Sequence, residues 1–294
     1  MVLSIENINK TYGPNKVLHD VSFTATNKNT LGLLGRNGHG KSTTIKIIMG
    51  IISSDSGTVT IDGSPVNSAN FKLGYLPEER GLYQKVSIVD QMAYFGSLRG
   101  LSRPAAKKAA LHYLERLDMN EYIGKKASEL SKGNQQKIQL AIALMNDPDI
   151  LILDEPYSGL DPVNSKMLQD IIEEVASRNK LVIFSSHELG RVEEFCDDIV
   201  ILNRGHVVIE GNLREIKKAY PRTEIFVQGT DLDLSGLSAT PFKDGYKIPF
   251  DTNSAKEAIL HQVARQNLDT YSVVEPTLLQ IFLEKVGEEQ GVEL

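Results

Sequence analysis

The chain has 294 residues, which is enough for one large domain and a small one. Its 32 lysines and arginines against 38 aspartates and glutamates give a net charge of −6, which argues against a nucleic-acid binder, because such a protein needs a basic face. The sequence contains neither an apolar run of about 20 residues that could span a bilayer nor a signal-peptide pattern, and its single Cys196 fits a reducing compartment.

The first part of the chain has the pattern of an α/β domain. Residues 3–13 and 17–26 alternate apolar and polar side chains, which indicates two strands joined by a turn. A short apolar strand at 31–35 runs into a glycine-rich loop, and a helix is expected at 42–50. This succession of strand, loop and helix predicts a core with a parallel sheet.

The next part is predicted to be helical. Residues 87–100 and 104–118 and the later part of 131–146 favour helices, so we expect a helical insertion over about residues 84–147. Apolar strands then return at 149–154, 181–186 and 198–203, the last followed by a hairpin turn at 203–206.

After Tyr220-Pro221 the pattern restarts. Strands are predicted at 223–229, 246–250 and 269–276, with an amphipathic segment at 255–267 and a helix from residue 277. We therefore expect two domains, residues 1–218 and a small α+β domain of residues 219–294.

Residues 35–42, GRNGHGKS, match the pattern G-x-x-x-x-G-K-[ST] of a phosphate-binding loop between a strand and a helix. Its glycines let backbone N–H groups face phosphate oxygens, Lys41 should reach the β- and γ-phosphates of a nucleotide, and the Ser42 hydroxyl should ligate Mg²⁺. His39 stands where such loops commonly carry alanine, and it either faces solvent or contacts phosphate. The expected nucleotide contacts of this segment are Gly35, Arg36, Asn37, Gly38, His39, Gly40, Lys41, Ser42 and Thr43.

The apolar run DILILDEP at residues 149–156 ends in two carboxylates. Such a run predicts a buried parallel strand, whose carboxyl end is where ligands sit in open α/β sheets. Asp154 is placed to hold Mg²⁺ through water, and Glu155 to point at the water in line with the γ-phosphate. Phosphoryl transfer needs mainly positioning and charge neutralisation, so these two carboxylates and Lys41 would suffice for the protein's part in it.

The chain resembles the ABC (ATP-binding cassette) ATPases over roughly residues 1–215, because several of their motifs occur in the family's order. LSKGNQQK at 130–137 resembles the family signature, and SGLD at 158–161 resembles the D-loop. His187 resembles the switch histidine, and Tyr12 the aromatic residue that stacks on adenine. The resemblance implies an α/β P-loop NTPase core with an antiparallel β subdomain and a helical insertion, followed here by the small C-terminal α+β domain.

The resemblance also implies a site shared by two subunits. Ser131 and Gly133 of one subunit would cover the γ-phosphate of the ATP held by the other, with Asp161 nearby, in a homodimer or a heterodimer. Glu155, His187 and Lys41 would be the catalytic residues. Glu78, where the family usually has glutamine, would join Ser42 and Asp154 near Mg²⁺ but cannot donate an N–H. Lys132 replaces a signature glycine, and it either assists the γ-phosphate of the partner or faces solvent.

The resemblance further implies an ATPase subunit whose integral membrane permease is a separate chain. The permease would dock on residues 78–99, which would place this subunit in the cytoplasm on the inner face of the membrane. YLPEERGLY at 75–83 and the C-terminal appendage resemble ATPases of bacterial exporters of the drug, antibiotic or sodium type. The appendage is interpreted first as a structural or dimer-stabilising module and second as a regulatory sensor.

Two other classes of function are weighed against this one. A soluble ABC ATPase that acts on a cytosolic macromolecule would usually carry two cassettes, a long coiled coil or zinc modules, and the sequence has none of these. A GTPase would need an Asn-Lys-x-Asp element, which neither Asn15-Lys16 nor Asn179-Lys180 begins.

Overall fold

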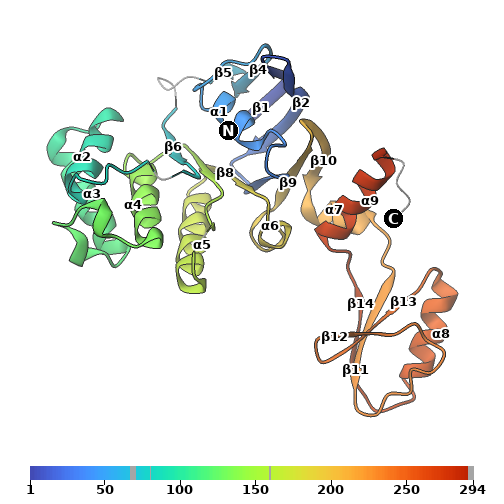
Figure 1. Cartoon of the computed structure of the whole chain (residues 1–294). Helices are drawn as coiled ribbons and strands as arrows, with labels where there is room; N and C mark the ends of the chain where they lie inside the picture. Colours follow the sequence, from blue (N-terminus) through green and yellow to red (C-terminus); the bar gives the residue numbers. More distant parts are fainter. Residues whose placement is uncertain (67–70, 80, 159, 291–294) are drawn as a thin grey trace. The chain divides into compact units, whose positions relative to one another are not determined.

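The computed structural model describes residues 1–66, 71–79, 81–158 and 160–290. It divides into two units, Met1–Asn212 and Leu213–Leu294, which are described separately (Figure 1). Helix α7 (Leu213–Ala219) belongs to the second unit. The second unit therefore begins at residue 213, six residues before the expected boundary at residue 219.

A six-stranded sheet forms the centre of the first unit, with the strand order β10-β9-β3-β8-β7-β6. Its strands are β3 (Leu31–Leu34), β6 (Leu73–Leu76), β7 (Ile150–Asp154), β8 (Leu181–Ser186), β9 (Asp198–Asn203) and β10 (His206–Asn212). All neighbours are parallel except β10, which pairs with β9 as a hairpin. Strands β7 and β8 are buried along their whole length, as the apolar runs predict. Two helices, α5 (Pro162–Ser177) and α6 (Leu189–Phe195), contact β8.

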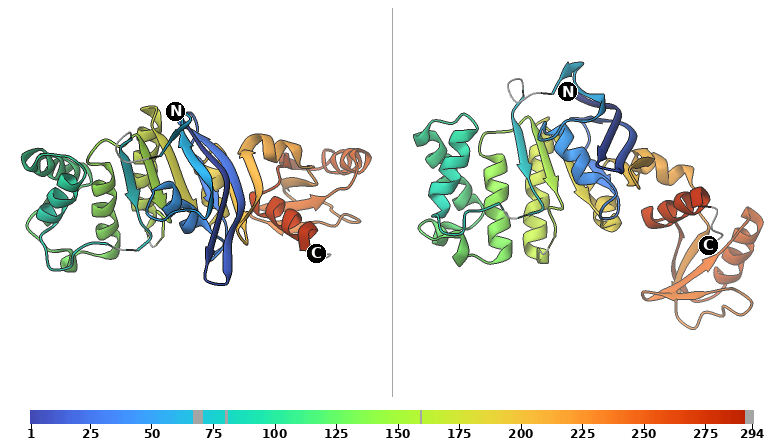
Figure 2. Two further views of the ribbon diagram at one scale, coloured as in Figure 1. Left: turned by 90° about the horizontal axis from the view of Figure 1, so that it is seen from above. Right: turned by 45° about the horizontal axis from the view of Figure 1, so that its top comes forward.

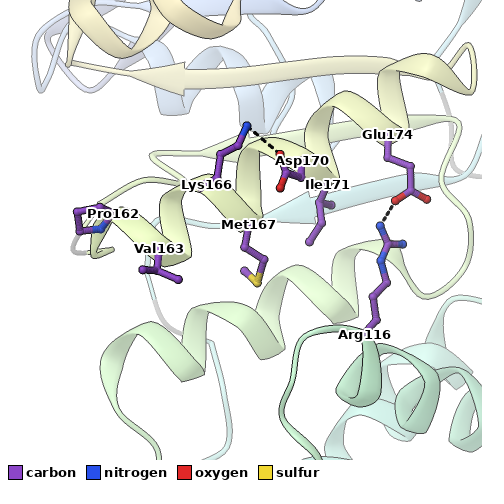
Figure 3. A pocket seen from close by; sticks show the side chains of 8 residues that line it. All are labelled: Arg116, Pro162, Val163, Lys166, Met167, Asp170, Ile171 and Glu174. Carbon is purple, nitrogen blue, oxygen red and sulfur yellow. Dashed lines mark hydrogen bonds and ion pairs between the residues drawn. The ribbon is translucent and has the colours of Figure 1, made fainter.

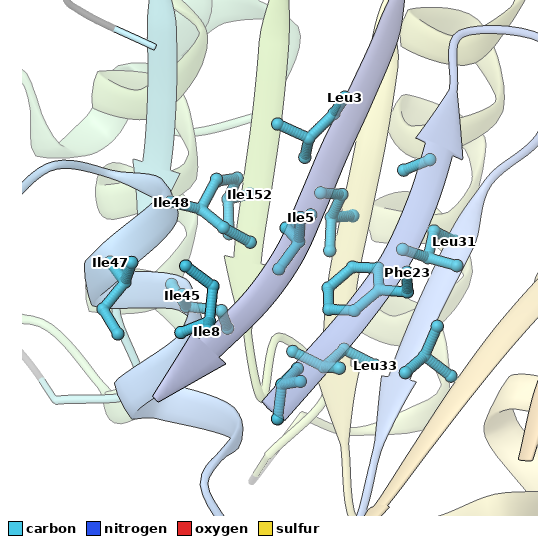
Figure 4. Close-up of a cluster of buried hydrophobic side chains, with 14 of the residues drawn as sticks. Leu3, Ile5, Ile8, Phe23, Leu31, Leu33, Ile45, Ile47, Ile48 and Ile152 are labelled. Carbon is cyan, nitrogen blue, oxygen red and sulfur yellow. The ribbon is translucent and has the colours of Figure 1, made fainter. Parts of the chain in front are cut away.

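An antiparallel sheet of order β2-β1-β4-β5 accompanies this parallel sheet. It consists of β1 (Val2–Tyr12), β2 (Asn15–Thr26), β4 (Ser56–Ile61) and β5 (Ser64–Pro65). Helix α1 (Lys41–Ile48) contacts strands of both sheets, and its Ile45 and Ile48 join Ile5 of β1 and Ile152 of β7 in one buried cluster (Figure 4). Because α1 is anchored on two sides, the loop that enters it is held in a fixed place.

The helical insertion contains α2 (Ile88–Leu98), α3 (Arg103–Arg116) and α4 (Lys132–Leu144), with short 3₁₀ turns at Asn120–Tyr122 and Ala127–Glu129. The three helices lie together beside the six-stranded sheet in both views of Figure 2. Each begins after a serine, Ser87, Ser102 or Ser131, whose side chain accepts a hydrogen bond from the backbone N–H three residues later. These serines cap the helices and explain where each of them starts.

The second unit has its own core. Four antiparallel strands in the order β12-β13-β11-β14 form its sheet: β11 (Glu224–Gly229), β12 (Thr240–Phe242), β13 (Gly245–Pro249) and β14 (Leu268–Val274). Ile225, Val227 and Ile248 of this sheet pack with Ile259 and Val263 of α8 (Asn253–Val263). The last helix is α9 (Leu278–Gln290). In the part of the chain that the structure describes, no helix combines the length and the apolar character needed to cross a bilayer.

Candidate functional site

A cavity of about 510 Å³ in the first unit gathers segments that are far apart in the sequence. It lies between the end of β1, the phosphate loop, Glu78 and the end of β7. Its lining residues are Tyr12, Val17, Arg36, Asn37, Gly38, Gly40, Lys41, Ser42, Thr43, Glu78 and Glu155. The volume is in the range typical of small-molecule sites.

The backbone of the phosphate loop requires glycine at several points. Gly35, Gly38 and Gly40 have φ values of 151°, 83° and 104°, which side-chain-bearing residues rarely adopt. A Cβ at Gly35 would lie 2.5 Å from the Leu202 carbonyl oxygen, and one at Gly40 would lie 2.5 Å from Leu18 Cδ2. The loop therefore packs tightly on its protein side, whereas a Cβ at Gly38 would meet open space beside the cavity. This arrangement fits a loop that presents its backbone to phosphate.

The turn between β9 and β10 supports this loop. The Gly205 N–H donates to the His39 carbonyl at 3.2 Å, and the Gly205 carbonyl accepts from the His19 N–H at 2.9 Å. Gly205 has φ 80°, and a Cβ there would lie 2.1 Å from the Val17 carbonyl oxygen. The sequence predicts the hairpin turn but not its contact with the phosphate loop.

Lys41 is a nearly buried cation in the wall of the cavity, with 5% of its surface exposed. Its Nζ donates to the Gly35 carbonyl at 2.7 Å and lies 3.4 Å from Glu155 Oε1. Glu155 is 6% exposed, and its Oε1 makes no hydrogen bond with the described residues. A buried ammonium beside an incompletely paired carboxylate fits a site that takes both an anion and a water molecule.

The position of Glu155 is fixed by β8 and the residue that follows it. The Glu155 backbone has φ 49°, and its N–H donates to the Ser185 carbonyl at 3.2 Å and to Ser185 Oγ at 3.1 Å. His187 Nδ1 lies 2.9 Å from Glu155 Oε2, although the histidine itself is 46% exposed. The carboxylate thus lies between Lys41 and His187. A left-handed backbone at a buried residue is a strain that functional sites often retain.

Asp154 is buried next to Glu155 and is held by two neighbours. Its carboxylate accepts hydrogen bonds from Ser185 Oγ and from the Tyr75 hydroxyl. Burial and the negative charge of Asp154 together raise the pKa of Tyr75 to about 12, so the phenol stays a donor. Two acceptor positions of the carboxylate remain for a metal ion or its water. Sequence reasoning missed Ser185 and Tyr75, because only the pairing of β7 with β8 and β6 brings them to Asp154.

Three further predicted residues differ in their relation to the cavity. Tyr12 is 47% exposed and lines it, and Glu78 also lines it. His39 does not belong to the lining. Burial and the nearby charges of Arg36 and Lys41 lower the pKa of His39, so it is neutral at pH 7.

Ser131, Gly133 and Asp161 form a second cluster, and none of them lines the cavity. Ser131 caps α4, while Asp161 caps α5 and accepts from Asn164 N at 2.9 Å and Asn164 Nδ2 at 2.6 Å. These bonds, with a contribution from the positive charge of Lys137, lower the pKa of Asp161. A Cβ at Gly133 would lie 3.7 Å from Asn164 Nδ2, so the starts of α4 and α5 adjoin. Gly159, which was assigned to the D-loop, lies outside the described residues.

A larger hollow of about 640 Å³ lies along α5 (Figure 3). Its walls include the ion pairs Arg116–Glu174 and Lys166–Asp170 and the exposed Val163. None of the predicted nucleotide-binding residues lines it. The smaller cavity around Lys41 is therefore the candidate functional site.

Comparisons with known proteins identify the family of the chain. Residues 18–158 match the family described as ABC transporter, and residues 211–286 match the C-terminal domain of DrrA1-3-like ATP-binding proteins. The uncharacterized ABC transporter ATP-binding protein YhaQ of Bacillus subtilis (strain 168) is 37% identical over 97% of this chain and 99% of its own length.

Two further similar proteins match about three quarters of the chain. The Nod factor export ATP-binding protein I of Burkholderia lata is 32% identical over 71% of this chain and 70% of its own length. A solved structure of an ATP-binding subunit of an ABC transporter superposes with a TM-score of 0.67 at 28% identity, covering 74% of this chain and 93% of the other. The chain therefore belongs to the ATP-binding subunits of ABC transporters, which are ATPases, and carries a DrrA-like C-terminal domain.

Proposed function

We propose that this ATPase drives export through a separate membrane permease by closing and opening a dimer around ATP. One observation carries the proposal. Lys41 and Glu155 lie in one cavity with the phosphate loop, whereas Ser131 and Gly133 lie in a cluster outside it. The residues that the family resemblance assigns to one ATP molecule are thus divided between two places on the chain.

ATP would bind with its adenine on Tyr12 and its phosphates along residues 35–43. Lys41 would offset the charge of the β- and γ-phosphates, since its buried ammonium already lies in the cavity wall. Ser42 would hold Mg²⁺, with Asp154 and Glu78 acting through its water ligands. When bound, the ion would offset charge on the β- and γ-phosphate oxygens. Glu78 would accept hydrogen bonds from such water ligands, but it cannot donate one to a phosphate as glutamine can.

Glu155 would orient the attacking water and accept its proton. The water oxygen forms a bond to the γ-phosphorus while the bond from that phosphorus to the bridging oxygen of ADP breaks, giving ADP and phosphate. His187 would keep the carboxylate turned toward the water through its 2.9 Å contact with Oε2.

The second cluster would act on the ATP of a partner subunit. The start of α4 presents free N–H groups and the Ser131 hydroxyl, which together favour an anion. Because this helix start does not line the subunit's own cavity, a head-to-tail pair with two-fold symmetry would bring it to the γ-phosphate of the mate. Asp161, near Gly133, would then lie at the same interface between the two subunits. The pair is two copies of this chain or this chain with a related ATPase.

A docking surface for the permease is proposed on residues 78–99. Tyr83, Tyr94 and Leu98 are 53%, 52% and 65% exposed, so three large side chains of this segment face solvent. A groove of about 600 Å³ runs beside Tyr94, and it would take a cytoplasmic helix of the permease. Docking there would place the subunit on the inner face of the membrane. The similarity to an ATP-binding protein of Nod factor export supports export as the direction of transport.

The variant Glu155→Gln tests the dimer and the catalytic assignment together. We expect ATP turnover to fall by about 100-fold or more, because the water loses its proton acceptor. We also expect a dimer in ATP but not in ADP, measured by sedimentation velocity, because bound ATP is no longer consumed. The double variant Glu155→Gln/Lys41→Ala is the control and should stay monomeric. Near-normal turnover, or a monomer at saturating ATP, would contradict the proposal. Recovery of the native chain from membranes without any polytopic partner would contradict the proposed association with a membrane permease.

A further inference from the structure

Two glutamines of α4 reach out of the helical insertion to the loops that carry the two carboxylates of the cavity. Gln136 Nε2 donates to the Pro156 carbonyl, directly after Glu155. Gln139 Nε2 donates to the Glu79 carbonyl at 3.1 Å, directly after Glu78. The two glutamines are three residues apart and therefore lie on the same face of the helix.

Packing alone does not account for Gln139. It is 6% exposed and lies in the half of α4 where its neighbours Ile138 and Leu140 are buried and apolar. A buried amide costs stability unless its hydrogen bonds are made, and an apolar side chain would fill the position at lower cost. The bond that Gln139 makes joins α4 to the Glu78 segment.

The Pro156 contact acts on a strained part of the chain. Glu155 has a left-handed backbone, and the Glu155 carbonyl accepts from the Ser158 N–H at 3.1 Å in the turn that follows. Gln136 holds the carbonyl between these two residues, so a shift of α4 by about 1 Å would either break this bond or move the turn that positions Glu155.

We propose that Gln136 and Gln139 are positioning residues that couple the Ser131 end of α4 to Glu155 and Glu78 of the same subunit. This inference rests on the dimer proposed above. When the start of α4 binds the γ-phosphate held by the mate, α4 takes a defined position. The two amide hydrogen bonds then fix the segments of Glu155 and Glu78 in the subunit's own cavity. Occupation of one site therefore prepares the other, and ATP turnover is cooperative.

The variant Gln136→Met/Gln139→Met tests this coupling, because methionine has a similar length but no N–H donor. We expect kcat to fall by about 10- to 100-fold, as misplacement of a catalytic group by about 1 Å does. We expect the Hill coefficient for ATP to fall to about 1. The Kd for ATP of the isolated subunit should change less than about twofold, since Tyr12 and Lys41 are untouched.

Gln169→Met is the matched control, because the hydrogen bonds of the Gln169 amide on α5 with the described residues go to the side chains of Lys166 and Glu173. It should leave kcat, the Hill coefficient and the unfolding midpoint unchanged. The single variant Gln136→Met, at a half-buried position, serves if the double variant folds poorly.

Three results would overturn the inference. The double variant could keep both kcat and the Hill coefficient unchanged, or it could lose kcat while its Hill coefficient stays unchanged. The third is that the wild-type protein itself shows a Hill coefficient of about 1 for ATP. Absence of an ATP-dependent dimer in Glu155→Gln would instead overturn the proposed function, so the two failures are distinguishable.

Discussion

Replacement of Gly205 by alanine tests how the β9–β10 turn supports the phosphate loop. Gly205 has φ 80° and exchanges backbone hydrogen bonds with His39 and His19. An added Cβ would lie 2.1 Å from the Val17 carbonyl oxygen, a separation that carbon and oxygen atoms do not tolerate. The turn must therefore move, and the loop bonded to it must move with it.

The size of the effect follows from two contributions. An alanine in the left-handed region costs about 1–2 kcal/mol. Relief of an overpacked contact costs a further 1–3 kcal/mol or so. Gly205→Ala should therefore lower the free energy of unfolding by about 3 kcal/mol, which corresponds to a Tm lower by roughly 6–12 °C in a unit of this size.

Gly63→Ala is the matched control. Gly63 has φ 77°, but a Cβ there would meet no atom within 4 Å. It pays only the backbone strain, so its loss of stability should be about 1–2 kcal/mol. The difference between the two variants isolates the contact at Val17.

Thermal unfolding and ATP binding measure the two consequences separately. We expect Gly205→Ala to weaken ATP binding by about 10-fold or more at a temperature where the variant is folded, because loop geometry sets the phosphate contacts. Gly63→Ala should bind ATP as the wild type does. Equal losses of stability in the two variants, or unchanged ATP affinity in Gly205→Ala, would refute the reasoning.

Two other predictions concern Tyr12, which lines the cavity, and Tyr75, which donates a hydrogen bond to Asp154. Tyr12→Ala should weaken ATP binding by roughly 5- to 100-fold, which is the contribution of one stacked base, whereas inorganic triphosphate should bind as before. Equilibrium titration with both ligands measures this, and equal weakening of both would contradict stacking of adenine on Tyr12. The folded-state pKa of Tyr75, about 12, is above the ordinary value near 10, so its stabilising contribution is complete below pH 10 and lost between pH 10 and 12. The unfolding midpoint should therefore fall less over that range in Tyr75→Phe than in the wild type, and an equal fall would exclude the contribution.

The sequence predicts the secondary structure best where one physical signal decides it. The apolar runs before Gly35 and Glu155 are buried parallel strands, as predicted. Helices α5 and α6 were not predicted, because charged residues interrupt their apolar positions. Strand β6 was not predicted, because its four residues are too few to show a pattern. The fold class of the ABC cassette is confirmed by the family match.

The site was predictable only as far as motifs describe it. Lys41 and Glu155 were placed near one ligand because each follows a buried strand, and their proximity of 3.4 Å is a consequence of the sheet order. Ser185 was not singled out, because a serine in a strand has no distinctive pattern, and Gly205 was predicted only as part of a hairpin turn. Their roles come from pairing across the sheet and from a hairpin contact, which only the three-dimensional arrangement provides.

A mixture of two inactive variants tests the central proposal most directly. Lys41→Ala removes the ammonium of the cavity, and Ser131→Arg blocks the start of α4. If each site combines the cavity of one subunit with the helix start of its mate, half of the mixed dimers are heterodimers that retain one intact site. The mixture should therefore recover ATP turnover up to about one quarter of the wild-type value, which is the value for independent sites, and less if the sites are coupled. Turnover in the mixture that only equals the average of the two variants alone, or full turnover by Ser131→Arg alone, would contradict a site shared between subunits.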